Sequence, residues 1–476
     1  MKNLIIFTIL FTSLSIAVLP SMGAGIKTPQ GIKSPSVVSI QSYDDVFYYK
    51  GIKTPQGVED LSELIYTTGW ALVIGINEYT SAERKYATDD ADAVANLLQV
   101  KYGFDKKNIT ILKNGEATKQ KIMDKIASYK EPKKVSKEDC LMIFFSGQGL
   151  TLNLPEKDEQ GFLVPYNTKL DLSKEQEYEV YKQNCIGMNE LKQAIKDINA
   201  RHILVVADAC VGGIEKWQSP APEIAISSYL LKVSAAGGQQ IIVAGGKDEK
   251  PSESDIFKHG LLTANLFNGL KDDKTDENKD LVTTGSELAS YLTKTVSDAT
   301  GGKQKPVFAH SGAGEFIFAA QPFPVAVIEM EKGGKIVIQF YPLDAPNTVD
   351  NFIKLTQKGF YDGVTFHRVE PNLLIQGGDP SGNGSGGPGY TIKAEFNSQK
   401  HIAGTVAMAR RPDPNSAGSQ FYICITPLPS LDGKYTVFGQ VIEGMDVVKG
   451  VQKGDKMKKV TIVDMATLNP KKDEKK

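Results

Sequence analysis

Two strand ends in the N-terminal half carry residues that could perform thiol chemistry. The apolar run 140–145 leads into Gln148, and the apolar run 202–207 leads into Asp208 and Cys210. Ligands of an open parallel sheet bind beyond the carboxyl ends of its strands, so these side chains are expected to share one site. A free thiol with a pKa of about 8.5 is mostly protonated near neutral pH and needs a base. The carboxamide of Gln148 cannot accept that proton.

Other bases for Cys210 are scarce. His202 precedes it on the same strand and would lie about 26 Å away in an extended chain. The sequence leaves His259 open as a base, although nothing specific favours it. The structural alternative for Cys210 is a small residue packed at a strand end, because free cysteine is usually buried.

The residues at these two strand ends, with the segments 70–76 and 257–263, resemble the caspase-like cysteine peptidases, in particular the bacterial relatives of metacaspases. The resemblance covers about residues 66–318. It implies a histidine at the position of Gln148, which would activate the thiol.

The same resemblance implies a binding pocket for a basic side chain at the P1 position of a substrate. Asp208 would hold that side chain, and Asp90 would be the second acid of the pocket. Because the base is missing, we predict a degenerate peptidase that retains the pair Cys210 and Gln148. A cysteine endopeptidase with basic P1 specificity is the alternative.

Oxygen-bearing side chains near residue 280 have the spacing of a calcium-binding loop. Positions 1, 3, 5 and 12 of such a loop would be Asp276, Asn278, Asp280 and Glu287. Position 6 normally needs Gly for a left-handed turn, which costs a residue such as Leu281 about 1–2 kcal/mol. Calcium is therefore one interpretation and an acidic, solvated loop is the other. Apart from calcium, we expect no cofactor.

A second set of residues lies in four ordered segments of the C-terminal part: Phe366-His-Arg-Val369, Gln376-Gly-Gly-Asp379, the segment 415–422 and the segment 431–439. They resemble the cyclophilin-type peptidyl-prolyl cis-trans isomerases over about residues 323–468. The resemblance implies a closed eight-stranded antiparallel barrel with flanking helices. It also implies proline-containing polypeptides as partners.

Proline isomerisation is slow because the peptide bond has partial double-bond character, with a barrier of about 18–20 kcal/mol. A guanidinium that stabilises the lone pair of the prolyl nitrogen lowers this barrier without a covalent step or a metal. By resemblance Arg368 is that guanidinium, and Gln376 and Gln420 orient the substrate backbone. The substrate-binding residues implied in this way are Phe366, Leu373, Leu374, Tyr422, Leu431 and Tyr435.

Several positions depart from the commonest eukaryotic pattern of this family. Leu373 and Tyr422 stand where Phe is expected, and Tyr435 stands where His is often found. Ser430 occupies the position of a Trp on which the family's macrocyclic inhibitor relies. We therefore expect this macrocyclic inhibitor to bind weakly. We also expect Leu373, which lacks the aromatic ring of Phe, to weaken one wall of the proline pocket.

The elements that must position these residues follow from the hydrophobic pattern. Between residues 70 and 318, continuous apolar runs alternate with amphipathic stretches, which is typical of a parallel sheet covered by helices on both faces. Beyond residue 323 the pattern changes to alternating strands rich in glycine, with an early helix at 347–357. The predicted fold is multidomain, with a doubly wound α/β caspase-like domain followed by a mostly β, cyclophilin-like barrel.

Composition limits the possible partners. The chain of 476 residues has 41% hydrophobic and 23% charged residues, which is ordinary for folded domains, and is too long for one core. Its formal net charge of -1 gives no overall electrostatic attraction to nucleic acid, so we expect no nucleic-acid partner.

The first 23 residues have the pattern of a signal peptide, since their apolar stretch is short for a membrane span of about 20 residues. We therefore expect export to the periplasm or the extracellular space, with an uncleaved anchor as the alternative. Export would allow Cys140, Cys185, Cys210 and Cys424 to form two disulfides, in any of three possible pairings.

Residues 24–65 read as a Pro- and Gly-rich linker in which the sequence GIKTPQG occurs twice, and residues 469–476 read as a charged tail. Taken together, the sequence predicts an exported prolyl isomerase that carries a degenerate caspase-like domain. A non-catalytic peptide-binding scaffold is the rival of a different class.

Overall fold

The computed structural model describes residues 66–464, except 80–83, 155–157, 167, 169–177, 215–228, 248, 281 and 321–322. The predicted signal peptide, the linker with its repeat, Leu281 and the charged tail therefore lie outside the described residues. No helix in the described part of the chain is both long and apolar enough to cross a membrane.

The N-terminal domain is built on a six-stranded sheet with the order β12-β8-β7-β3-β1-β2. Five strands are parallel and the edge strand β12 is antiparallel. The strands are β1 (Gly69–Gly75), β2 (Ile109–Lys113), β3 (Cys140–Ser146), β7 (His202–Cys210), β8 (Gly238–Gly245) and β12 (Val307–Gly312). The central strands β3 and β7 are buried along their whole length, which explains their unbroken apolar runs.

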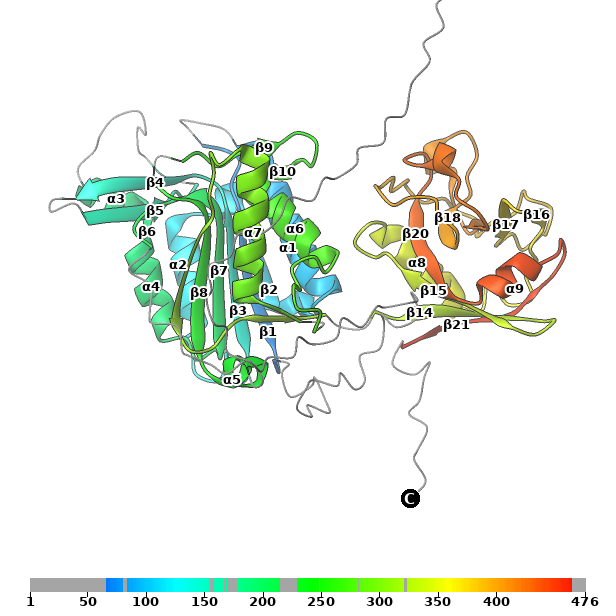
Figure 1. Ribbon diagram of the computed structural model, residues 1–476, viewed down its shortest axis with the longest axis horizontal. Coiled ribbons are helices and arrows are strands. Elements are labelled where there is room, and N and C mark those ends of the chain that lie inside the picture. Colours follow the sequence, from blue (N-terminus) through cyan, green and yellow to red (C-terminus); the bar gives the residue numbers. More distant parts are fainter. Residues whose placement is uncertain are drawn as a thin grey trace, which may run out of the picture. The chain divides into compact units, whose positions relative to one another are not determined.

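Helices cover both faces of this sheet (Figure 1). On one face lie α1 (Ala87–Val100), α6 (Leu261–Lys271) and α7 (Gly285–Thr300), whose apolar residues share a core with Ala71 and Val73 of β1. On the other face lie α2 (Lys119–Ser128) and α4 (Met188–Lys196), which pack against Leu72 and Ile74. The alternation of neighbouring β1 residues between two cores confirms the doubly wound α/β prediction.

Smaller elements complete the N-terminal domain. A three-stranded antiparallel sheet consists of β4 (Gly149–Leu154), β5 (Asp158–Leu163) and β6 (Ile186–Gly187). Two-stranded pairs are formed by β9 (Glu253–Ser254) with β10 (His259–Gly260), and by β11 (Val282–Thr284) with β13 (Ile317–Ala319). The short helices are α3 (Tyr178–Asn184) and α5 (Tyr229–Ala235).

The C-terminal domain contains an eight-stranded antiparallel sheet with the order β16-β17-β19-β18-β20-β15-β14-β21. Its strands are β14 (Val325–Met330), β15 (Lys335–Phe340), β16 (Arg368–Glu370), β17 (Leu374–Gly377), β18 (Thr405–Met408), β19 (Phe421–Cys424), β20 (Val437–Glu443) and β21 (Met457–Val463). A bridge between Thr365 and Lys456 links the two ends of the sheet. The prediction of eight antiparallel strands is confirmed.

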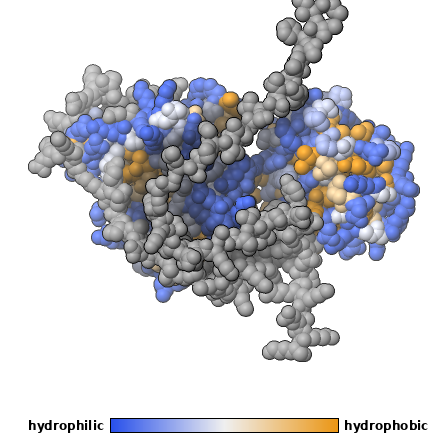
Figure 2. Space-filling model, viewed as in Figure 1, coloured by the Kyte–Doolittle hydropathy of each residue, from blue (hydrophilic) through white to orange (hydrophobic). Residues whose placement is uncertain are grey.

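Two helices flank this sheet, α8 (Pro346–Gln357) and α9 (Met445–Gly450). The sequence predicted α8 correctly, because Pro346 occupies its first turn, where a missing N–H costs nothing. Hydrophilic residues cover much of the described surface in Figure 2, while apolar residues gather on the C-terminal domain in the region of β18 and β20.

The cysteines do not form disulfides. Cys140, Cys185, Cys210 and Cys424 are all buried and free. Cys140 lies at the start of β3, Cys210 lies at the end of β7, and Cys424 belongs to the C-terminal domain. The fold therefore separates thiols that could have paired on composition alone.

Candidate functional sites

The isomerase-like site lies on one face of four neighbouring strands of the C-terminal sheet. The register places Arg368 of β16 opposite Gln376 of β17, which lies opposite Tyr422 of β19, which in turn lies opposite Ala407 of β18. Residues directly opposite each other share one face of a sheet. The alternate residues, such as Ile375, are buried in the main core of the domain.

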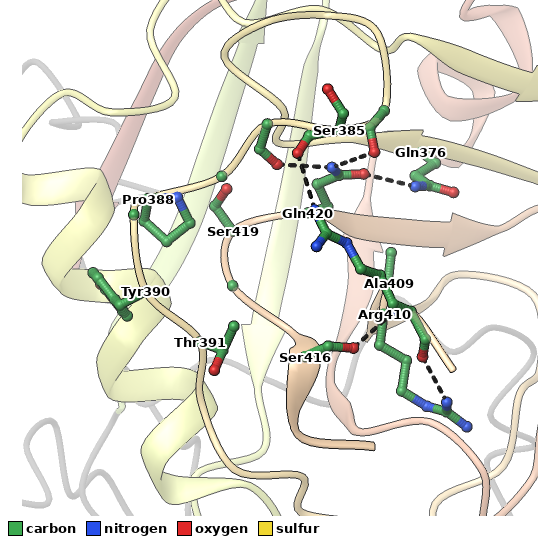
Figure 3. A pocket seen from close by; sticks show the side chains of 16 residues that line it. Gln376, Ser385, Pro388, Tyr390, Thr391, Ala409, Arg410, Ser416, Ser419 and Gln420 are labelled. Atoms are coloured by element: carbon green, nitrogen blue, oxygen red, sulfur yellow. Dashed lines mark hydrogen bonds between the residues drawn. The ribbon is translucent and has the colours of Figure 1, made fainter. Parts of the chain in front are cut away.

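Three side chains form a hydrogen-bonded row on this face. One guanidinium nitrogen of Arg368 donates to Oε1 of Gln376 at 3.4 Å, and Nε2 of Gln376 donates to Oε1 of Gln420 at 3.0 Å. Figure 3 shows the two glutamines reaching toward each other. Arg368 also contacts Glu370 at 3.2 Å, and its side chain is 54% exposed. The guanidinium is therefore held in place while remaining open to a substrate.

An apolar patch lies beside this row. Ala407, Tyr422, Cys424 and Val437 form its buried floor. Packed against the floor are the partly buried side chains of Tyr341, Leu374, Ala409, Leu428, Leu431 and Tyr435. Leu373, also predicted to bind substrate, is 46% exposed and is not among the side chains packed against the floor. The structure thus brings Leu374, Tyr422, Leu431 and Tyr435 together.

Phe366 does not belong to this surface. Its ring is fully buried in the main core of the domain, in an edge-to-face contact with Phe421. Its predicted substrate contact is therefore corrected to a role in packing. The residue precedes β16 by two positions, and the sequence could not show that its ring points inward.

Tyr422 is anchored by a network that the sequence analysis missed. Its hydroxyl lies 2.9 Å from Nε2 of His401, whose Nδ1 lies 3.0 Å from a carboxylate oxygen of Asp432. His401 is buried, and its backbone N–H also donates to Asp432. Hydrogen bonds from His401 lower the pKa of Asp432 to about 2. The phenol that replaces the expected Phe therefore finds a partner, as buried hydroxyls require.

Arg410 is a second residue that the sequence analysis missed. Its guanidinium stacks 4.7 Å from the centroid of the Tyr435 ring and donates to the carbonyls of Lys434, Arg411 and Pro412. Tyr435 in turn meets Tyr422 edge to face. Arg410 thus fixes one wall of the apolar patch, and the Arg410-Arg411 pair was the only signal for it in the sequence.

In the N-terminal domain, the predicted thiol lies within the sheet. Cys210 is the last residue of β7, paired with Gly245 of β8, and only 5% of it is exposed. The prediction that it lies beyond the strand end is corrected, because β8 extends the pairing of β7 through an irregularity after Ala207. Burial raises the pKa of the Cys210 thiol to about 12; Asp208 and Glu249 add to the effect and Arg84 opposes it.

Gln148 occupies the turn between β3 and β4. Its backbone N–H donates to the hydroxyl of Tyr79 at 3.0 Å, and its carbonyl accepts from the N–H of Val164. A Cβ atom on the next residue, Gly149, would lie 2.6 Å from the carbonyl oxygen of Cys210. The turn that should carry the base therefore packs against the backbone of Cys210.

The two predicted pocket acids are buried together. Asp90, in the first turn of α1, accepts from the hydroxyl of Ser146 at 2.7 Å. Asp208 accepts from the N–H and hydroxyl of Thr263 at 2.9 and 2.8 Å. Both carboxylates are fully buried. Burial raises the pKa of Asp208; Arg84 and Thr263 oppose this effect and Asp90 adds to it.

A basic side chain of the protein itself lies against Asp208. Arg84 is 7% exposed, and its guanidinium lies 3.6 Å from Asp208 and 3.4 Å from Glu253. His259 also belongs to the cluster, with Nδ1 at 2.8 Å from Asp90 and its ring near Phe267. Asp208, which would receive a basic substrate side chain, therefore already contacts a guanidinium.

The predicted calcium loop has another local explanation. The backbone N–H of Asp280 donates to the side chains of Asp276 and Asn278, and Glu287 forms a capping box with Thr284 at the start of α7. The described residues contain no group of three or more acidic, His or Cys side chains arranged for a metal. Calcium binding by this loop stays a prediction.

Comparisons with known proteins match both parts of the chain. The family model described as caspase domain matches residues 68–316, and the one described as cyclophilin type peptidyl-prolyl cis-trans isomerase matches residues 325–467. A peptidyl-prolyl cis-trans isomerase of Synechococcus elongatus is 53% identical over 29% of this chain and 95% of that protein. Peptidyl-prolyl cis-trans isomerase B of Bacillus subtilis is 50% identical over 28% of this chain and 94% of that protein.

Among solved structures, a cyclophilin type peptidyl-prolyl cis-trans isomerase of Cryptosporidium parvum matches with 28% sequence identity. The match covers 31% of this chain and 99% of that chain, with a TM-score of 0.29.

Proposed function

Because the chain belongs to the caspase-domain family over residues 68–316 and to the cyclophilin-type peptidyl-prolyl isomerases over residues 325–467, we propose that it works as a prolyl isomerase whose caspase domain lacks peptidase activity. The row of Arg368, Gln376 and Gln420 beside an apolar patch carries the first part of the proposal. The Gln148 turn against a protonated, buried Cys210 supports the second part.

The isomerase mechanism follows from the geometry of the row. The apolar patch accepts the proline ring, and the two glutamines offer amide groups to the neighbouring peptide backbone. Arg368 can then direct an N–H group at the prolyl nitrogen, whose lone pair becomes available as the peptide bond twists. This interaction forms only in the twisted state, so it lowers the barrier rather than merely binding the substrate.

Turnover of a proline-containing peptide by the full chain tests the isomerase assignment. We expect Arg368→Ala to lower kcat/KM at least about tenfold, or about 1.4 kcal/mol. Arg368→Lys is the matched control, since it keeps the charge but loses the planar fork, and we expect an intermediate rate. Equal rates for wild type and Arg368→Ala would refute the mechanism. Binding of the peptide without turnover would favour the scaffold alternative.

The proposed loss of peptidase activity has two supports besides the missing base. The thiol of Cys210 is protonated at neutral pH, and Asp208, which should receive a basic P1 side chain, faces Arg84. A substrate would have to displace that guanidinium. We propose that Arg84 occupies the position of a P1 side chain, so restoring the base alone leaves the pocket blocked.

Cleavage of peptides with Arg or Lys at P1 tests this proposal. We expect no cleavage by the wild type, little by Gln148→His, and more by the double variant Gln148→His with Arg84→Ala. Lys85→Ala replaces Arg84→Ala in the matched control, because Lys85 is an exposed neighbouring cation. Wild-type cleavage that Cys210→Ala abolishes would overturn the proposal and favour His259, held by Asp90, as the base.

A further inference from the structure

A cavity adjoins the isomerase row. It has a volume of about 380 Å³ and is lined by the loop 384–391 and by residues near Arg411 and Ser419. Gln376 and Gln420 belong both to its lining and to the row that ends at Arg368. Figure 3 shows this arrangement, with the two glutamines at one side of the cavity. A peptide whose proline contacts Arg368 can therefore place a nearby side chain in the cavity.

The glycine-rich wall of the cavity is held in shape by one buried carboxylate. Asp379 is 1% exposed and accepts hydrogen bonds from the N–H groups of Ser381, Asn383 and Gly384. Burial alone would raise its pKa, but hydrogen bonds from the hydroxyl and N–H of Ser381 and from the N–H groups of Gly384 and Gly386 outweigh burial and lower the pKa of Asp379 to about 2. Gln420 completes the wall by donating to the carbonyls of Gly384 and Gly386. The wall is thus preorganised before a ligand enters.

The lining has charge of one sign only. Among its sixteen residues are two arginines and no Asp, Glu, Lys or His. The guanidinium of Arg410 is engaged by Tyr435 and by three backbone carbonyls, as described above. Arg411 is exposed and donates one hydrogen bond, of 3.3 Å, to the carbonyl of Ser385 across the cavity. Its backbone is fixed by a 2.8 Å hydrogen bond to the hydroxyl of Ser416.

Resting on the isomerase function proposed above, we infer that this cavity selects substrates with an acidic side chain close to the proline. A guanidinium offers several N–H donors to a carboxylate, and a charge-assisted pair of this kind is stronger than a neutral hydrogen bond. The hydroxyls of Ser385 and Ser416 already donate to the side chain of Asn383 and to the carbonyl of Asp413. Arg411 is therefore the donor that a carboxylate in the cavity would use. A basic side chain would meet only the positive charge of Arg411 and the already engaged Arg410, so it is disfavoured.

The experiment compares isomerisation of peptide sets that differ at one residue. Glu, Gln or Lys is placed in turn at each of the three positions before and after the proline, and kcat/KM is measured for the full chain. We expect one position at which Glu exceeds Gln by about fivefold and Lys by more, and a smaller difference at high salt, because screening weakens an exposed ion pair. Arg411→Ala should reduce the Glu-to-Gln ratio to within about twofold, and Arg411→Glu should reverse the order of Glu and Lys.

Lys459→Ala on β21 is the matched control, since it removes an exposed positive charge from another strand and should keep the Glu preference. Melting curves of each variant show whether it is folded. No Glu preference at any position, or a preference that survives in folded Arg411→Ala, would overturn the inference while leaving the isomerase function intact. Absence of turnover with every peptide, neutral ones included, would instead overturn the isomerase function on which the inference rests.

Discussion

The reactivity of Cys210 provides the sharpest test of the N-terminal site. Burial and two negative neighbours raise its pKa to about 12, compared with about 8.5 for a free thiol. Near neutral pH its thiolate fraction is then lower by about three orders of magnitude. A thiolate of higher pKa is intrinsically more nucleophilic. With a Brønsted slope of about 0.4–0.5, this greater nucleophilicity raises the alkylation rate by between one and two orders of magnitude and so offsets part of the loss. We therefore expect alkylation at about one-hundredth of the rate of a free cysteine.

The assay is alkylation by iodoacetamide, followed by peptide mapping that separates Cys210 from the other three cysteines. The denatured chain provides the reference rate for the same peptide. In the folded protein the rate should rise about tenfold per pH unit well beyond pH 9, whereas the denatured reference should level off near its lower pKa. Glu249→Gln should increase the neutral rate severalfold, because it removes one of the charges that oppose the thiolate.

The result that would refute this reasoning is modification of Cys210 in the folded protein at neutral pH within about threefold of the denatured rate. Such a rate would mean that the thiolate is stabilised by a group other than Gln148. Cys210→Ser, which should lose the labelled peptide altogether, verifies the assignment.

Three further predictions concern pH, calcium and inhibition. Burial lowers the pKa of His202 to about 4 in the folded protein, against about 6.5 in the unfolded chain. As the pH falls, the unfolded chain therefore binds the proton first. About 3 kcal/mol of folding stability should be lost between these two pH values. Chemical denaturation of wild type and His202→Gln across this range checks it, and equal pH slopes would contradict it. If the loop 276–287 binds calcium, millimolar calcium should raise the melting temperature of the N-terminal domain, since a ligand of the folded state stabilises it; an unchanged curve would support the acidic-loop interpretation. The family's macrocyclic inhibitor should bind weakly because Ser430 stands in place of Trp. In an inhibition assay, Ser430→Trp should tighten binding at least about tenfold. Tight inhibition of the wild type would contradict the prediction.

The sequence by itself determined both folds and the identities of the reacting groups. Buried strands such as 140–145 read as unbroken apolar runs because both of their faces are covered, and this pattern is local. The absence of a base at Gln148 is likewise visible without a structure, since it depends on residue type alone. Arg368, Gln376 and Gln420 lie in ordered segments close enough in sequence to be recognised together.

Only the tertiary structure decided which side chains meet. Arg84 reaches Asp208, and His401 reaches Tyr422, through pairings between distant segments that no local pattern encodes. Burial also depends on what packs above a residue, so the inward direction of Phe366 and the enclosure of Cys210 by β8 were not visible in the sequence. Because charge and hydrogen-bonding energies depend strongly on burial, the fold, and not the residue types, set the pKa of the thiol and filled the acidic pocket.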